Sequence, residues 1–275
     1  MLQRDGHVVM PTQEMGLKTG PAIDLRSVGR NQASTFTGLC NEHDSGLFLP
    51  IDGDQFDIHD PKHLFLLAYR SVLKEYHATL QAAQSAQGFL NDSVDAGSID
   101  PDSMSSLMLL AVGRIVDSYE TFLYWMELND LLENEAHSQL ESEVLTLPST
   151  RSSLAVSALF PLQVDRHKTE VPPSMILNIL PQADGTHVAA FSWLHAHSAW
   201  AHGLLPRIRD ARGKHLLYEL SKLVLEKCEN FVLAPDFVDT FTDDRRKTIV
   251  QYFSGNMSSL RTSVEMDTPD LMLME

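Results

Sequence analysis

The residues best suited to chemistry are a cysteine and a histidine three positions apart, Cys40 and His43. In a tight turn both side chains can reach one ion at about 2.0–2.3 Å, the usual distances from zinc to nitrogen and sulfur. Two further ligands are needed, and the sequence offers His7 together with one of Asp44, His59 or His63. The alternative interpretation is structural, with Cys40 a small buried residue and His43 part of a turn.

Asp44 follows His43 directly and has two predicted roles at such a site. A histidine that binds a metal usually donates its other ring N–H to a carboxylate, which fixes the orientation of the imidazole. We expect Asp44 to orient His43 in this way or to bind the ion itself.

The segment around these residues, 28–56, resembles a group of uncharacterised bacterial proteins. Their shared pattern is Ala-Ser-Thr-Phe-x-Gly-Phe-Cys-x-x-His-Asp followed by Phe-x-Pro-Ile-Glu, matched here by residues 33–44 and 48–52 apart from Leu39 and Asp52. That group also has an upstream Cys-x-x-Cys that looks like the zinc half of an HNH or treble-clef unit. This chain lacks the Cys-x-x-Cys, while its Gly6–Pro11 run could be the remnant of a second upstream element of that group, Ser-His-hydrophobic-Ile-Pro. The resemblance therefore implies a degenerate zinc knuckle.

Two weaker constellations involve other histidines. The pair His195-x-His197, followed by His202, could place imidazoles on one face of a strand end, as some metal-dependent hydrolases require. No acidic residue lies nearby in sequence to support them. The flanking Trp193 and Trp200 favour the edge of an aromatic core instead.

The second weaker constellation, Arg209-Asp210 followed by His215, resembles the Arg-polar-x-His motif of HEPN ribonucleases. An arginine fork suits phosphate oxygens, so the resemblance implies metal-independent RNA cleavage. Gly213 interrupts the helix that such a motif needs, and the alternative is a solvated basic turn.

Two Asp-Pro pairs predict the helices that would position these groups, because each gives an N-cap acceptor followed by a proline preset for the first turn. Helices are expected after Asp60 and after Asp100. The apolar spacing that defines the first is Phe65, Tyr69, Val72, Tyr76 and Leu80, extending to about Ala86. The spacing of the second is Met104, Leu107, Ala111, Ile115, Tyr119, Phe122 and Met126, which we predict to be a core face.

Strand-type patterns occur at Leu154–Phe160, Met175–Leu180 and His187–Trp193, the last two around a hairpin loop at 181–185. Helical spacing returns at 216–231 and again after Thr242, which is expected to cap a short helix. The predicted fold class is α+β, a mainly helical body with a small antiparallel sheet. Its expected segments are a loop-rich Cys/His region with one or two short strands (1–58), the body (59–255) and a flexible acidic tail (256–275).

Composition narrows the function classes. The chain of 275 residues carries 37 acidic and 21 basic residues, a net charge of −16, which disfavours nucleic acid as a partner without excluding it. No Lys or Arg occurs from 115 to 150. The beginning of the chain shows no apolar signal core, and two cysteines make no disulfide framework, so we expect a cytoplasmic protein that does not enter membranes.

Three functions remain open at the level of sequence. The first is a binding or regulatory protein with a zinc knuckle that contacts a protein partner. The second is an HNH-like, metal-dependent nuclease with His7 or His43 as base, and the third is a HEPN-like ribonuclease that uses Arg209 and His215. Either nuclease would suit a bacterial defence setting. The only cofactor predicted is zinc.

Overall fold

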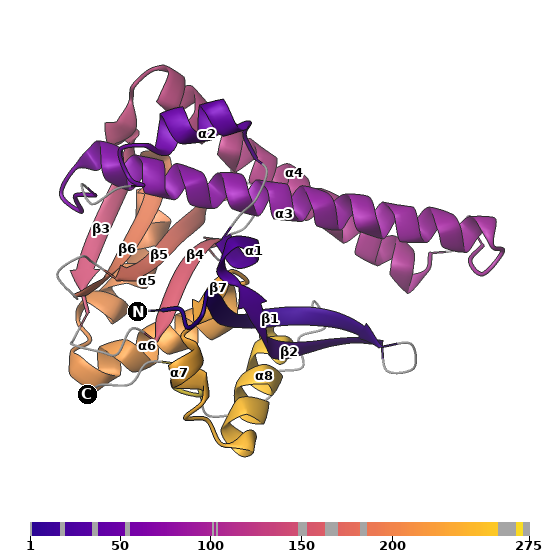
Figure 1. Ribbon diagram of the computed structural model, residues 1–275. Helices are drawn as coiled ribbons and strands as arrows, with labels where there is room; N and C mark the ends of the chain where they lie inside the picture. Colours follow the sequence, from indigo (N-terminus) through magenta and orange to yellow (C-terminus); the bar gives the residue numbers. More distant parts are fainter. Residues whose placement is uncertain are drawn as a thin grey trace. The chain divides into compact units, whose positions relative to one another are not determined.

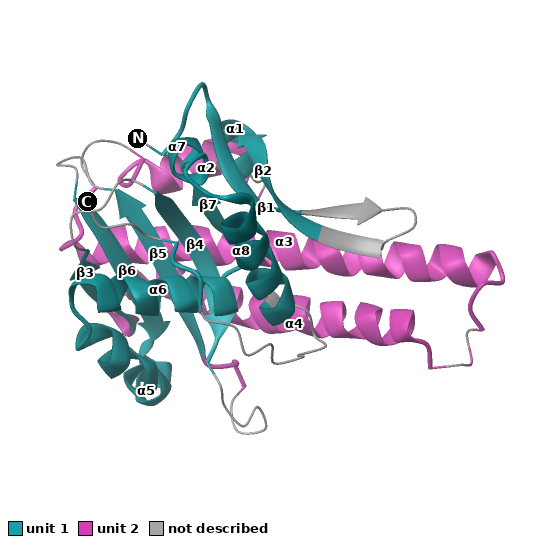
Figure 2. Ribbon diagram, turned by 90° about the horizontal axis from the view of Figure 1, so that it is seen from below, with its two compact units in different colours: residues 1–35, 140–162, 174–275 teal, residues 36–139, 163–173 magenta. Residues whose placement is uncertain are grey.

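A computed structural model of the chain describes residues 2–16, 20–34, 38–52, 56–100, 102, 104–147, 153–162, 170–181, 186–257 and 268–271. It confirms the predicted α+β class. The chain forms two compact units, shown in different colours in Figure 2: unit 1 comprises residues 1–35, 140–162 and 174–275, and unit 2 comprises residues 36–139 and 163–173. The domain boundaries expected at 58 and 255 stay predictions.

Unit 1 is built on a seven-stranded antiparallel sheet, larger than the sequence indicated. Its order is β2-β1-β7-β4-β5-β6-β3. The strands are β1 (His7–Gly16), β2 (Gly20–Gly29), β3 (Leu140–Thr146), β4 (Leu154–Pro161), β5 (Ser174–Pro181), β6 (His187–Leu194) and β7 (Phe231–Leu233). The three predicted strands are confirmed as β4, β5 and β6, while the loop expected between β5 and β6 lies mostly outside the described residues.

Helices of unit 1 pack their apolar faces on this sheet. They are α1 (Arg30–Ser34), the 3-10 turn η3 (His195–His197), α5 (Ser198–Arg209), α6 (Gly213–Lys227), α7 (Pro235–Val238) and α8 (Asp243–Met257). The predicted cap of α8 is confirmed, because the hydroxyl of Thr242 accepts a hydrogen bond from the Arg245 N–H at 3.2 Å. Phe231, expected to belong to the helical pattern at 216–231, instead begins strand β7, which lies between β1 and β4 in the sheet.

The first and last parts of the chain are more ordered than expected where the structure describes them. The region predicted to be loop-rich contains the ten-residue strands β1 and β2, which pair along their full length. Within the predicted tail, Leu271 is fully buried and its N–H donates to the Ser221 hydroxyl at 3.0 Å. Residues 268–271 are therefore packed on unit 1.

Unit 2 consists of α2 (Asn41–Phe48), α3 (Pro61–Asp95), α4 (Ser106–Glu133) and η1 (His137–Gln139). Figure 1 shows α3 and α4 running side by side as a long antiparallel hairpin. The predicted start of α3 is confirmed, since Asp60 caps it and Pro61 is its first residue. The start of α4 was predicted too early: the helix begins at Ser106, with Ser105 rather than Asp100 as its cap.

The predicted rotation of α4 about its axis is wrong. Ile115, expected in the core, is 41% exposed, and Tyr119 is 60% exposed. The side chains that α4 buries are instead Ala111, Ser118, Thr121, Tyr124 and Leu128. This face is partly polar, so apolar periodicity alone could not identify it.

No helix within the described ranges is both long and apolar enough to cross a membrane.

Candidate functional site

The sequence motif places its cysteine and histidine together at the start of α2. Cys40 occupies the N-cap position in an extended conformation, and His43 lies one turn into the helix. The Sγ atom of Cys40 is 3.0 Å from Nδ1 of His43, and both side chains are exposed. The structural interpretation of Cys40 as a buried residue is wrong, whereas the other cysteine, Cys228, is fully buried.

Arg70 of α3 organises the rest of the motif. Its guanidinium group pairs with both oxygens of Asp52, at 3.4 Å for Nη2 to Oδ2 with a closer Nη1 contact to Oδ1, and lies 3.5 Å from Asp44. It also lies 4.6 Å over the ring of the buried Phe48. The Phe48–Asp52 part of the motif thus attaches α2 to α3, and Asp44 faces Arg70.

The other predicted ligands have their own partners. Nδ1 of His63 accepts a hydrogen bond from the N–H of Asp57 at 3.0 Å, and the N–H of His59 binds the Asp57 carboxylate at 2.8 Å. In unit 1, Nδ1 of His7 lies 2.9 Å from the carbonyl oxygen of Asp5. In the part of the chain that the structure describes, no group of three or more His, Cys, Asp or Glu side chains could hold a metal ion. Among the predicted ligands in the described part of unit 2, Cys40 and His43 are the pair whose donor atoms lie close together.

Arg209 and His215 are held by different carboxylates. Arg209 forms a bidentate pair with Glu143, at 2.8 and 2.7 Å, and this contact raises the pKa of Arg209. Nε2 of His215 lies 3.9 Å from Glu219. Gly213, at a φ of 54°, begins a new helix between the two, as its position in the sequence indicated.

The His195-x-His197 pair is divided between two environments. His195 is exposed and its Nδ1 lies 2.5 Å from Glu141, while His197 is buried and packs edge-on against Trp200. Glu141 also accepts hydrogen bonds from Trp193 and Ser198, each at 2.8 Å.

Burial alone would raise the pKa of Glu141, but hydrogen bonds from His195, Ser198 and Trp193 together lower it. The carboxylate that supports His195 comes from β3, far away in sequence, which is why sequence spacing missed it. The arrangement of these side chains favours the predicted aromatic edge of the core over a metal site.

A feature that the sequence did not predict is an exposed apolar stripe on α4, here called the α4 seam. Its residues repeat at steps of three and four: Leu109, Val112, Val116, Tyr119, Leu123 and Met126. Five are exposed, among them Val112 at 51%, and Leu123 is partly exposed. This spacing is the heptad pattern of a coiled-coil interface. The seam shares Tyr119 and Met126 with the stripe that the sequence predicted to be the core face of this helix.

Carboxylates border the α4 seam on one side. Asp117, Glu120 and Glu127 follow the seam at neighbouring positions, and Asp130 and Glu133 continue the heptad spacing beyond Met126. The only basic residue in the central part of α4 is Arg114, which pairs with Asp117 at 3.7 Å. The border of the seam is therefore acidic.

Comparison with known proteins gave no match: no protein-family model, curated protein or solved structure is similar to this chain.

Proposed function

We propose that this chain is a binding protein that holds a basic amphipathic helix of a partner protein on the α4 seam. The observation that carries the proposal is the exposure of Val112, Val116 and Tyr119 along one continuous face of a folded helix. Large apolar side chains gathered in one exposed stripe mark interaction surfaces in soluble proteins.

The spacing of the α4 seam favours a helix as the bound element. From Leu109 to Met126 the seam spans 18 residues, about 26 Å at 1.5 Å per residue. A partner helix with its own apolar residues every three and four positions can insert them between those of the seam. A helix of about five turns would cover its length.

The acidic border favours a basic partner over a second copy of the chain. Lys or Arg side chains flanking the apolar face of a partner helix would meet Glu120 and Glu127. A second copy packed antiparallel would bring these carboxylates opposite one another, and each copy has a net charge of −16. Complementary charge also accelerates association at low salt.

The proposal is tested by titrating a fluorescent 18-residue Leu/Lys heptad peptide against the protein. We expect saturable binding that the paired substitution Val116→Asp and Tyr119→Asp weakens at least tenfold. The control is Leu49→Asp, which changes an apolar residue that is 73% exposed but lies outside α4. Equal weakening by both variants would refute the seam as the binding surface, with circular dichroism showing that each variant is folded.

Sedimentation of the protein without peptide tests whether a second copy of the chain occupies the α4 seam. We expect a species of one chain. A dimer that dissociates with the same paired substitution would assign the α4 seam to a second copy, against the proposal.

We also propose that Cys40 and His43 supply two ligands of a zinc knuckle, since their donor atoms lie 3.0 Å apart at an exposed helix start. Purified protein should contain close to one equivalent of zinc, lost in Cys40→Ser and His43→Ala and kept in Cys228→Ser. Metal-free protein under non-chelating purification would contradict this. The HNH-like and HEPN-like nuclease functions stay predictions.

A further inference from the structure

A pocket of about 310 Å³ lies in unit 1 where the β1–β2 hairpin approaches α7 and α8. Its charged lining consists of Arg4, Arg26 and Arg246 with a single carboxylate, that of Asp239. Three guanidinium groups and one carboxylate give this lining a formal charge of +2 in a chain of net charge −16. The lining thus presents three cations in an acidic chain, while Asp24 and Asp236, which pair with the same arginines, bring the formal charge of the whole cluster to zero.

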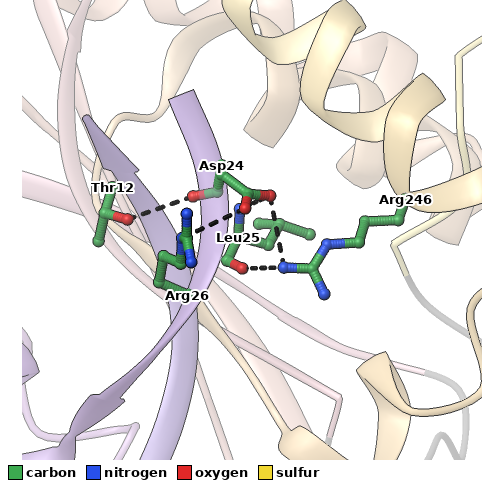
Figure 3. Close-up of polar contacts among 5 residues, drawn as sticks. All are labelled: Thr12, Asp24, Leu25, Arg26 and Arg246. Carbon is green, nitrogen blue, oxygen red and sulfur yellow. Dashed lines mark hydrogen bonds and ion pairs between the residues drawn. The ribbon is translucent and has the colours of Figure 1, made fainter. Parts of the chain in front are cut away.

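Two of these arginines are fixed by a carboxylate that does not line the pocket. Figure 3 shows Asp24 of β2 between Arg26 and Arg246. Its Oδ2 atom lies 3.2 Å from Nε of Arg26, and its Oδ1 atom accepts from Nη2 of Arg246 at 3.3 Å. Arg246, from α8, also donates to the carbonyl oxygen of Leu25.

Asp24 is itself held in place. Its Oδ1 atom accepts the N–H of Leu25 at 2.8 Å, and its carbonyl oxygen accepts the Thr12 hydroxyl at 3.3 Å. Both guanidinium groups are therefore oriented before any ligand arrives, and preorganised donors bind with a smaller entropic cost.

Arg4 approaches from another part of the lining. Its Nη1 atom pairs with Asp236 at 2.9 Å and with Asp239 at 2.5 Å. A guanidinium group has five N–H donors, and in the described part of the chain Arg4 uses only Nη1 for these pairs and Arg246 only Nη2. Both side chains retain donors for a bound anion.

The remaining lining is mostly apolar. Val9, Leu25 and Val238 are buried, and Pro235 lies beside them. A ligand that fits would combine a small apolar body with an oxyanion. The volume lies at the lower end of the range for small-molecule sites.

We propose that this pocket binds a small organic phosphate, the phosphate held by Arg4, Arg26 and Arg246 and its organic part lying on Val9, Leu25 and Val238. Arginine forks match phosphate oxygens in geometry and charge, and a dianion makes use of several guanidinium groups at once. This site is independent of the α4 seam, which belongs to unit 2.

The experiment is isothermal titration calorimetry of the full chain with phenyl phosphate as the probe, beside inorganic phosphate and phenol. We expect saturable binding of phenyl phosphate, weaker binding of inorganic phosphate and none of phenol. Arg4→Gln and Arg26→Gln should each raise the Kd at least tenfold, whereas Arg26→Lys, which keeps the charge without the fork, should raise it less.

The matched control is Arg207→Gln, which removes a half-exposed arginine that is ion-paired with Glu219, in the same unit but outside the pocket. Its Kd should equal that of the parent. Absence of saturable binding to phenyl phosphate, or a Kd unchanged in both Arg4→Gln and Arg26→Gln, would overturn the proposal. Melting curves of each variant distinguish loss of binding from loss of fold.

Discussion

The hydroxyl group of Tyr69 on α3 donates a hydrogen bond to Oδ1 of Asn129 on α4 at 3.1 Å, and the Tyr69 hydroxyl oxygen accepts a hydrogen bond from the indole N–H of Trp125 at 3.3 Å. Tyr69 is buried, and burial raises its pKa, so it remains a donor at neutral pH. This polar contact fixes how α4 is rotated against α3. It turns Asn129 and Trp125 toward α3 and leaves Val116 and Tyr119 exposed.

Replacing Tyr69 by Phe should lower the free energy of unfolding by about 1–2 kcal/mol, because Asn129 and Trp125 lose a partner in a largely buried setting. Urea titration measures the change. Tyr119→Phe removes the same hydroxyl from an exposed position and should change stability by less than about 0.5 kcal/mol. Equal effects from the two substitutions would contradict the contact's role.

Ile115→Asp should leave the protein folded, since the side chain is 41% exposed and a carboxylate there stays hydrated. Leu128→Asp, at a fully buried position of the same helix, should unfold unit 2 because it buries an unpaired charge. Circular dichroism with thermal melting compares the two. Unfolding by Ile115→Asp would contradict the observed exposure of this side chain and would support the core face of α4 that was predicted from the sequence.

The rotation of α4 shows where sequence reasoning succeeds and where it stops. Strong local signals predicted correctly the Asp60 cap, the three central strands and the Thr242 cap, since each depends on neighbouring residues. Two apolar stripes of similar quality occur on α4, and neither is the face that α4 buries, which includes Ser118 and Thr121. The orientation of that face depends on contacts such as that of Tyr69 with Asn129, which form only on folding. A hydrophobic pattern cannot identify that face.

The candidate sites show the same division. The spacing alone predicted that the side chains of Cys40 and His43 lie close together, because residues three positions apart are neighbours on one turn of a helix. Arg70 beside Asp44, Glu141 beside His195 and Asp24 beside Arg246 come from distant parts of the chain. Those partners could be identified only after folding.

Thiol reactivity should differ sharply between the two cysteines. Cys40 is exposed and Cys228 is fully buried, so a disulfide reagent such as DTNB should modify one thiol of the metal-free native protein quickly and the second only after denaturation. Cys40→Ser should abolish the fast phase and Cys228→Ser should leave it unchanged. Two fast thiols would show that the packing around Cys228 is wrong.

Acid should destabilise unit 1 through His187. The side chain is buried, burial lowers its pKa below the usual 6.5, and its Nε2 atom has no hydrogen-bond partner within the described residues. Because the unfolded chain takes up this proton at a higher pH than the folded one, the contribution of His187 to stability is present above pH 6.5 and lost as pH falls below it. Urea titrations at pH 7.5 and 5.0 should therefore show a larger loss for the parent than for His187→Leu. Equal losses would contradict the assignment.

The central claim, that the α4 seam with its acidic border selects a basic helix, is tested most directly by reversing the border. Glu120→Lys with Glu127→Lys leaves every seam residue in place and reverses two of the three charges that border it, while Asp117 stays acidic. Fluorescence anisotropy at low salt should show that this variant binds a Leu/Glu heptad peptide more tightly than the Leu/Lys peptide, opposite to the parent. An unchanged preference for the Leu/Lys peptide, with folding intact, would contradict the claim.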